Sequence, residues 1–240
     1  MKTIINRAND RGSANYGWLT AKYSFSFANY YNQSNTNFGA LRVLNDDVIE
    51  GGMGFGKHPH DNMEIITIPL KGALKHKDSM SNEWITLQAG EVQVMSAGAG
   101  LMHSEMNNSS EEILNLFQIW IIPNKHNVTP RYNQKKFESF ERKKKLQPLV
   151  SSIDEEMDGT LKIHQDVKIS RLDLDSNSSF NYTLKSKNHG VYVMVIGGEI
   201  KIDNEYLETR DAMGISDSKN FSVHATENTE LLFIEVPMEF

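Results

Sequence analysis

Two short motifs in the first half of the chain carry side chains that could hold a metal ion. His58 and His60 flank Pro59, and His103 and Glu105 follow about 45 residues later. Because side chains alternate between the two faces of a strand, the members of each pair share one face. Three imidazoles and one carboxylate suit a divalent first-row transition metal and are too rich in nitrogen for calcium or magnesium. The motifs therefore predict one metal site with room for a ligand.

An alternative interpretation is that these histidines only cap loops or lie on the surface of two unrelated strands. That interpretation does not explain why the four ligand-type side chains occur as two pairs, each spaced so that both members share one face of a strand. Pro59 lacks a backbone N–H, which suits the end of a strand near the mouth of a barrel. We therefore favour the metal site.

The elements that must position these motifs are short strands. Runs with β-branched residues or alternation recur along the chain, separated by Gly, Asn, Asp and Ser, as in residues 64–68, 84–87, 91–94, 119–122 and 191–196. Helical periodicity is scarce, and no alternation of strands with helices is present. We therefore expect an all-β protein, built as a sandwich or barrel.

The second half of the chain repeats the pattern of the first. Residues 68–75 resemble 194–201, each with a strand, a Gly turn and a strand, and 87–92 resemble 207–212. Such an echo indicates two copies of one structural unit. Counting from the hairpin glycines aligns the four ligand-type residues with Leu184, Ser186, His224 and Thr226. The second copy then lacks at least three ligands, so we predict one metal per chain, in the first half.

The repeat divides the chain into an N-terminal metal-binding domain (1–132), a connector (133–152) and a C-terminal domain that has lost the ligands (153–240). The connector is rich in Lys, Glu and Arg and contains the basic run 142–145. We interpret that run as a solvated face rather than a nucleic-acid patch, because the rest of the chain is acidic.

Composition excludes several classes of function. The 240 residues contain 25 Lys and Arg against 31 Asp and Glu, a net charge of −6, so we expect no nucleic acid as partner. No apolar run is long enough to cross a bilayer, and residues 1–6 run out of apolar side chains too soon for a signal peptide. The chain has no cysteine, which excludes disulfides and thiolate ligands and fits the cytoplasm.

The motifs together resemble those of the pirin family of the cupin superfamily. His58-Pro59-His60 with Glu64, the run Gly98-Ala99-Gly100 and His103-Ser104-Glu105 carry the resemblance, which extends from about residue 6 to residue 240. The chain is similar to the short bacterial pirin-like proteins described as quercetin 2,3-dioxygenases. The resemblance implies a bicupin, two antiparallel β-barrel or jelly-roll-like sandwich domains with few short helices.

The resemblance also implies the site and its activity. His58, His60, His103 and Glu105 would be the metal ligands, with iron(II) expected first and nickel, manganese, copper, cobalt and zinc as alternatives. The activity would be the oxidative ring opening of a flavonol such as quercetin, with release of carbon monoxide and with Glu105 as general base. The partners would be a small aromatic substrate and O2, with no membrane; the oligomeric state is open, and we expect a monomer.

The walls of the substrate pocket are a separate prediction. We expect Phe25, Met53 and Phe55 to contact a flat aromatic ligand, although the phenylalanines could equally be core residues. Glu64 is expected beside the ligands or at the rim of the site, and His76 at the surface or behind the ligands. The tryptophans, Trp18 and Trp120 among them, are expected to serve packing.

Two other classes of function remain open at this point. Eukaryotic pirins are described as metal-dependent transcriptional cofactors, so the chain could be a regulatory binding protein without physiological turnover. A cupin isomerase or a metal-free sugar-binding module would instead require a site that takes no metal.

Overall fold

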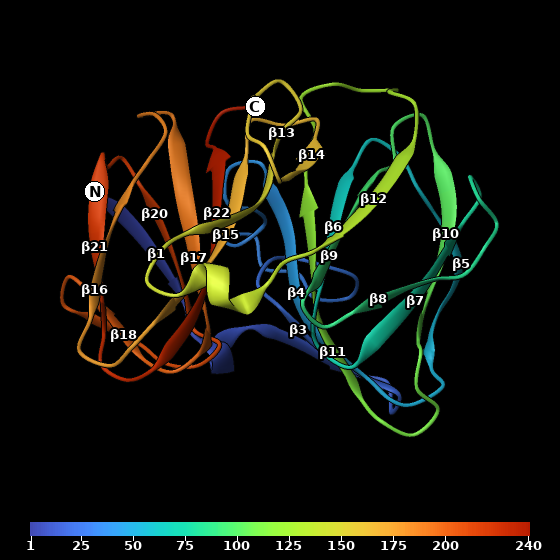
Figure 1. The fold of residues 1–240 in the computed structure, drawn as a ribbon, viewed down its shortest axis with the longest axis horizontal. Coiled ribbons are helices and arrows are strands. Elements are labelled where there is room, and N and C mark those ends of the chain that lie inside the picture. The colour runs from blue at the N-terminus through green and yellow to red at the C-terminus, as the bar shows by residue number, and fades with distance from the viewer.

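The computed structural model describes residues 1–240, which form strands and two short 3-10 helices, η1 (Ala8–Asp10) and η2 (Ser139–Arg142). Two sheet-built halves lie side by side, with strands of the first half on one side of Figure 1 and those of the second half on the other. Nearly all strand pairs are antiparallel, so the expected all-β architecture is confirmed. No helix has the length and apolar character needed to cross a membrane.

The first half consists of a seven-stranded and a four-stranded sheet. The large sheet has the order β12-β9-β6-β11-β4-β3-β2, and the small sheet has the order β5-β10-β7-β8. The bounds are β2 Gly12–Asn15, β3 Leu19–Tyr23, β4 Leu41–Ile49, β5 Gly54–His60, β6 Glu64–Lys71, β7 Ala73–Asp78, β8 Ile85–Gln88, β9 Glu91–Ser96, β10 Leu101–Asn107, β11 Leu114–Ile121 and β12 Arg131–Lys136.

The second half has the same construction. Its large sheet has the order β1-β20-β17-β22-β15-β13-β14, and its small sheet has the order β16-β21-β18-β19. The bounds are β1 Lys2–Asn6, β13 Gln147–Ser152, β14 Leu161–Ile163, β15 Lys168–Leu174, β16 Ser179–Thr183, β17 His189–Gly197, β18 Ile200–Ile202, β19 Glu205–Leu207, β20 Ala212–Ser216, β21 Asn220–Ala225 and β22 Thr229–Pro237. The two halves thus match strand for strand.

Strand pairing departs from the sequence-based division at three places, one of which is β13, which lies within the predicted connector but pairs with β15 in the sheet of the second half. The first strand of the chain, β1, pairs with β20 and so belongs to the sheet of the second half. The strand β12 pairs with β9 and extends the sheet of the first half to residue 136. Both β1 and β12 cover an edge that would otherwise leave backbone groups unpaired. Local sequence patterns do not reveal which edge a strand will join.

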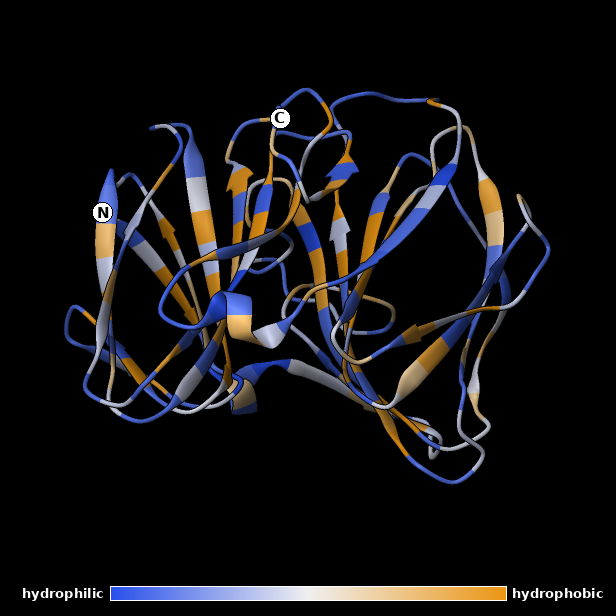
Figure 2. Ribbon diagram, viewed as in Figure 1, coloured by the Kyte–Doolittle hydropathy of each residue, from blue (hydrophilic) through white to orange (hydrophobic).

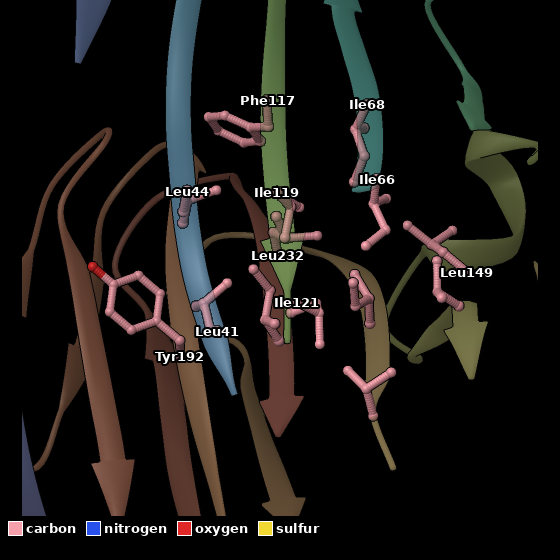
Figure 3. Packing of buried hydrophobic residues seen from close by; sticks show 14 of the residues in the cluster. Leu41, Leu44, Ile66, Ile68, Phe117, Ile119, Ile121, Leu149, Tyr192 and Leu232 are labelled. Atoms are coloured by element: carbon pink, nitrogen blue, oxygen red, sulfur yellow. The ribbon is translucent and has the colours of Figure 1, made fainter. Parts of the chain in front are cut away.

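The two large sheets pack against each other through an apolar interface. A cluster of 25 buried residues draws on both halves. Figure 3 shows Leu44, Phe117 and Ile119 of the first half near Tyr192 and Leu232 of the second. In Figure 2, hydrophobic segments run through the central strands, whereas many of the loops are hydrophilic. This interface leaves the far side of each large sheet to face its own small sheet and enclose a barrel interior.

Replacing Ile119 with Ala should lower the free energy of unfolding by about 2–5 kcal/mol, because it opens a cavity between the sheets. Ile119 is fully buried in the interface cluster. Denaturant unfolding followed by circular dichroism measures the effect. The control Ile153→Ala removes a side chain that is 39% exposed and should change stability by less than about 0.5 kcal/mol. Equal midpoints for I119A and the control would contradict the packing described above.

Candidate metal centre

The three histidines of the two motifs lie together at one end of the first barrel. His58 and His60 belong to β5, and His103 lies directly opposite His58 on β10. The ring centroids are 4.3 Å apart for His58 and His103, 4.8 Å for His60 and His103, and 5.0 Å for His58 and His60. One ring nitrogen from each lies within 4.8 Å of the others. The alternation of the two strands therefore brings the imidazoles to one point.

Glu105 lies on the same face of β10 as His103, beyond an irregularity in the pairing with β5. It forms a second group, with His76 and His103, whose potential ligand atoms also lie within 4.8 Å of one another. The Gln118 side chain donates a hydrogen bond of 3.0 Å to Glu105 Oε2 and accepts one of 3.2 Å from Thr67. These two residues of the large sheet hold the carboxylate in place and leave Oε1 free.

Unpartnered atoms test whether this group fits a metal ion. Both ring nitrogens of His103 and Oε1 of Glu105 are buried and have no hydrogen-bond partner. Buried polar atoms without partners are rare in folded proteins, and a cation would satisfy Oε1 of Glu105 and the one His103 nitrogen that carries a free lone pair. His58 Nδ1 lies 2.7 Å from the Gly56 carbonyl oxygen; as a donor to it, it leaves Nε2 as the free nitrogen.

The protonation states also fit a metal ion. Burial and the neighbouring imidazoles lower the pKa of His60 to about 4 and that of His103 to about 2, so both rings are neutral near pH 7. A neutral imidazole is the form that binds a metal. Burial raises the pKa of the Glu105 carboxyl to about 7, against the opposing effect of its hydrogen bonds. The donor set of imidazole and carboxylate is therefore compatible with a divalent transition metal.

His76 lies deeper in the barrel than its sequence context suggested. It is fully buried, its Nε2 lies 3.1 Å from Asp78 Oδ2, and its ring stacks on Tyr132 with centroids 4.9 Å apart. The ring centroid is 5.2 Å from that of His103. A surface position is therefore excluded. The alternation of His76 and Asp78 on a buried strand face was the signal available in the sequence.

A cavity of about 410 Å³ opens beside His58, His60 and Glu105. Of the three expected wall residues, only Phe55 lines it. Phe25 is 2% exposed and packs on Tyr192 in the interface between the large sheets, and Met53 is 41% exposed outside the cavity. The aromatic walls come instead from Trp18, Phe27 and Trp120. Two tryptophans expected only to pack, Trp18 and Trp120, therefore face the cavity.

Part of the cavity wall is polar. Asn45 and Asp47 of β4 line it, are 2% and 5% exposed, and each have a buried side-chain oxygen without a partner. Burial, with the nearby carboxylates of Asp46 and Glu105, raises the pKa of Asp47 to about 8. Sequence reasoning missed both residues, because Asn45-Asp46-Asp47 reads locally as a turn. In the sheet these residues alternate faces, and Asn45 and Asp47 share the inner one.

The buried Asp47 predicts a stability that falls as pH rises. Its folded-state pKa lies above the ordinary value of about 4, so the folded chain binds more protons than the unfolded chain between about pH 4 and 8. Asp47→Asn removes this titration. We expect chelator-treated D47N to gain about 1–3 kcal/mol over wild type at pH 8 and much less at pH 5, as measured by thermal unfolding.

The neighbouring Asp46→Asn is the matched control for that experiment. Asp46 lies on the other face of β4 and forms an ion pair with Arg210, in which Asp46 Oδ2 lies 3.1 Å from Arg210 Nε. Its replacement removes a favourable contact and should give no gain at pH 8. A D47N protein that loses equal stability at both pH values would refute the proposed protonation of Asp47.

Glu64 lies away from the ligands and does not reach the rim of the cavity. It is 1% exposed, accepts a hydrogen bond of 2.6 Å from Ser96 Oγ and receives a backbone hydrogen bond from His164. The reason is that β6 belongs to the large sheet and β5 to the small one. An even spacing puts two residues on the same face only within one strand, so the spacing of His60 and Glu64 does not place them on a common face.

The second barrel has apolar side chains where the first has its ligands. The hairpins at Gly72 and Gly198 correspond, and from there the strand pairings align His58 and His103 with Tyr182 and Phe221. The same pairings align His60 with Leu184 and Glu105 with Val223, and all four replacements belong to one buried cluster. Tyr182 and Phe221 stack with centroids 5.4 Å apart. The interior of this barrel is packed as a core.

The correspondences between the two halves that were predicted by counting residues from the hairpin glycines are therefore wrong. His224 faces the other side of β21, lies 3.0 Å from Ser179 Oγ through Nδ1 and does not correspond to His103. Leu184 matches His60 rather than His58, and Ser186 matches neither histidine. The loops of the two halves differ in length, so counting residues from a hairpin slips against the strand register.

Similarity to known proteins over nearly the whole chain shows which family it belongs to. The Pirin family model matches residues 5–121, and the model described as the quercetinase C-terminal cupin domain matches residues 149–236. A protein of Escherichia coli K12 named quercetin 2,3-dioxygenase is 44% identical over 97% of this chain and 98% of its own. The chain belongs to the pirin family. A pirin-like protein of Caulobacter vibrioides is 39% identical, over 93% of this chain and 95% of its own.

Solved pirin structures share the architecture. The E. coli bacterial pirin YhhW in complex with nickel(II) superimposes with a TM-score of 0.92 and 41% identity, over 98% of this chain and 99% of that chain. A quercetin 2,3-dioxygenase of Acinetobacter baumannii shares the fold, with a TM-score of 0.75 and 20% identity, over 99% of this chain and 86% of that one. The bicupin architecture expected from the sequence is thus confirmed for this pirin.

Proposed function

We propose that this pirin is a metal-dependent dioxygenase that opens the ring of a flavonol such as quercetin, consuming O2 and releasing carbon monoxide. The observation that supports the proposal is a group of three histidines, His58, His60 and His103, which shares His103 with a second group containing Glu105 and lies beside a 410 Å³ cavity with aromatic walls. Cavities of this size and lining are typical of sites for small aromatic ligands. The names of the bacterial relatives support the same activity.

The four ligand-type residues would hold one divalent metal, with iron(II) expected first. When bound, the metal would supply Lewis acidity toward the flavonol 3-hydroxyl and redox chemistry toward O2. The related YhhW structure is a nickel(II) complex, which supports nickel as the first alternative to iron(II). The neutral imidazoles described above are ready to bind without losing a proton.

The chain's own residues would bind, orient and deprotonate the substrate. Trp18, Phe55 and Trp120 offer flat apolar faces for the ring system and exclude water from it. Oε1 of Glu105, the oxygen that would also face the metal, would accept the proton of the 3-hydroxyl through its second lone pair, while Gln118 holds Oε2 and so aims the carboxylate. Asp47, on the polar wall, is placed to exchange a hydrogen bond with another hydroxyl of the ligand.

The experiment is turnover of quercetin by the metal-loaded protein under air, followed by loss of the visible absorbance and by detection of carbon monoxide. Anaerobic samples and samples treated with a chelator should be inactive, and returning the metal should restore the rate. Metal-loaded protein that binds quercetin but leaves it intact under air would rule out the proposed reaction.

A regulatory role finds less support in the structure. The candidate docking patch in the sequence is Lys143-Lys144-Lys145, but Lys144 pairs with Asp175 at 2.6 Å and the adjoining Arg142 pairs with Asp173. This pairing reduces the positive charge that the run presents to a partner. The cytoplasm and a monomeric state remain predictions from the sequence.

A further inference from the structure

A second large cavity, of about 500 Å³, lies between the two halves of the chain. Its walls come from the end of β6, the turn before β9, the connector around η2, and strands β15, β17 and β22. It shares no residue with the cavity at the metal centre. Figure 1 shows η2 in front of the junction between the two sets of sheets. A ligand here would therefore touch both domains without entering the first barrel.

The walls of this interdomain cavity are positively charged in an acidic protein. Five cationic side chains line it, Lys71, Lys136, Arg142, Arg171 and Arg210, against two carboxylates, Glu138 and Glu230, an excess of 5 − 2 = +3. The chain as a whole carries −6. Asp46 and Asp173 stand behind the wall and pair with Arg210 and Arg142. Counting them, the group still keeps an excess of 5 − 4 = +1.

The guanidinium groups are only partly satisfied by these carboxylates. Arg142 and Arg171 both direct Nη2 to the same oxygen of Glu230, which is itself half exposed. Arg171 is 7% exposed, and its Nε is buried without a partner, as is Nη1 of Arg210. Burial and, to a lesser extent, the nearby Arg142 lower the pKa of Arg171 to about 10, so its positive charge lies largely out of water and beside another cation. Added negative charge at this position would offset that positive charge.

We propose that the interdomain cavity is a binding site for a small organic anion that carries a phosphate or carboxylate group. Arginine presents donors in a planar fork that matches these groups, and charge-assisted hydrogen bonds of this kind are stronger than neutral ones. Leu70, Phe137 and Ile196 supply apolar wall for the body of the ligand. Arg142 and Arg171 would grip the anionic group, and Lys71 at the exposed edge would attract it.

The position of the interdomain cavity means that a bound anion should also affect the stability of the protein. Lys71 and Lys136 belong to the first half of the chain, Arg171 and Arg210 to the second, and Arg142 to the connector. An anion bound by both halves would tie them together, so its binding should raise the stability of the folded chain.

The test is calorimetric titration and thermal unfolding of the metal-loaded protein with β-glycerophosphate and, separately, with succinate. Sodium chloride of equal ionic strength controls for screening. We expect saturable binding and a rise in melting temperature with at least one probe, and the stronger probe identifies the anionic group as phosphate or carboxylate. No saturable heat with either probe at 10 mM, together with no stabilisation beyond the chloride control, would overturn the proposal.

Variants locate the binding. Arg142→Gln should weaken binding at least about 10-fold, and Lys71→Gln about 2- to 5-fold, since Lys71 is exposed and only adds charge at the edge. Lys187→Gln removes an exposed charge outside the cavity and should leave the affinity unchanged. If R142Q does not fold, the double variant K71Q/K136Q takes its place. Equal affinity in wild type and in the cavity variants would show that the anion binds elsewhere.

Discussion

Replacing His58 or His60 with Ala should lower metal affinity at least about 100-fold and abolish flavonol turnover. Each substitution removes one of three imidazoles whose nitrogens lie within 4.8 Å of one another. The expected metal content falls from one ion per chain to a small fraction, as measured by elemental analysis after dialysis. Activity should fall with it, since the substrate hydroxyl loses its Lewis acid.

His224→Ala and His76→Ala sharpen that experiment. His224 faces outward on the second barrel, and its loss should change neither metal content nor turnover. His76 belongs to the second group of potential ligands, with His103 and Glu105. If H58A and H60A keep a full complement of metal while H76A loses it, the ion lies deeper in the barrel than we propose.

Glu105→Gln should reduce kcat about 10²- to 10⁴-fold while much of the metal stays bound. The amide keeps the shape of the carboxylate and an oxygen that can accept the 3.0 Å hydrogen bond from Gln118, but it cannot take a proton from the substrate. The three imidazoles are unchanged. Steady-state turnover of quercetin, combined with elemental analysis of the same sample, separates loss of the base from loss of the metal.

Glu64→Gln is the matched control for the carboxylate. Glu64 is equally buried, and burial likewise raises its pKa to about 7, but it lies on the other face of the large sheet against Ser96. Its substitution should leave kcat within about 2-fold of wild type. An E105Q protein that turns over quercetin at the wild-type rate would show that another group takes the proton.

Features that lie within one strand could be predicted from the sequence. The ligand-type residues could be found from the sequence because His58 and His60, like His103 and Glu105, stand two residues apart on single strands. Within one strand the alternation of side chains is a local property of the backbone, so spacing is enough to place a pair on one face. The short strands and the Gly turns of the repeat could also be predicted, because they too depend on patterns among neighbouring residues.

Contacts between strands were not visible in this way. Glu64 shares parity with His60, yet a change of sheet between β5 and β6 sends it to the opposite side of the large sheet. Phe25 and Phe27 share parity, but only Phe27 reaches the cavity. His224 stands near the expected place in the repeat, but the register of β21 puts it on the outward face of that strand.

The sequence alone determined the class of fold, the two-copy organisation and the two dyads that could bind a metal, because each rests on patterns within a few residues. Only the tertiary structure decided which aromatic residues wall the cavity, that Asp47 and His76 lie inside the barrel, and that β1 completes the sheet of the second half. Those features depend on the pairing of strands far apart in the chain, where register and loop length set each side chain's position, and no local pattern encodes either quantity.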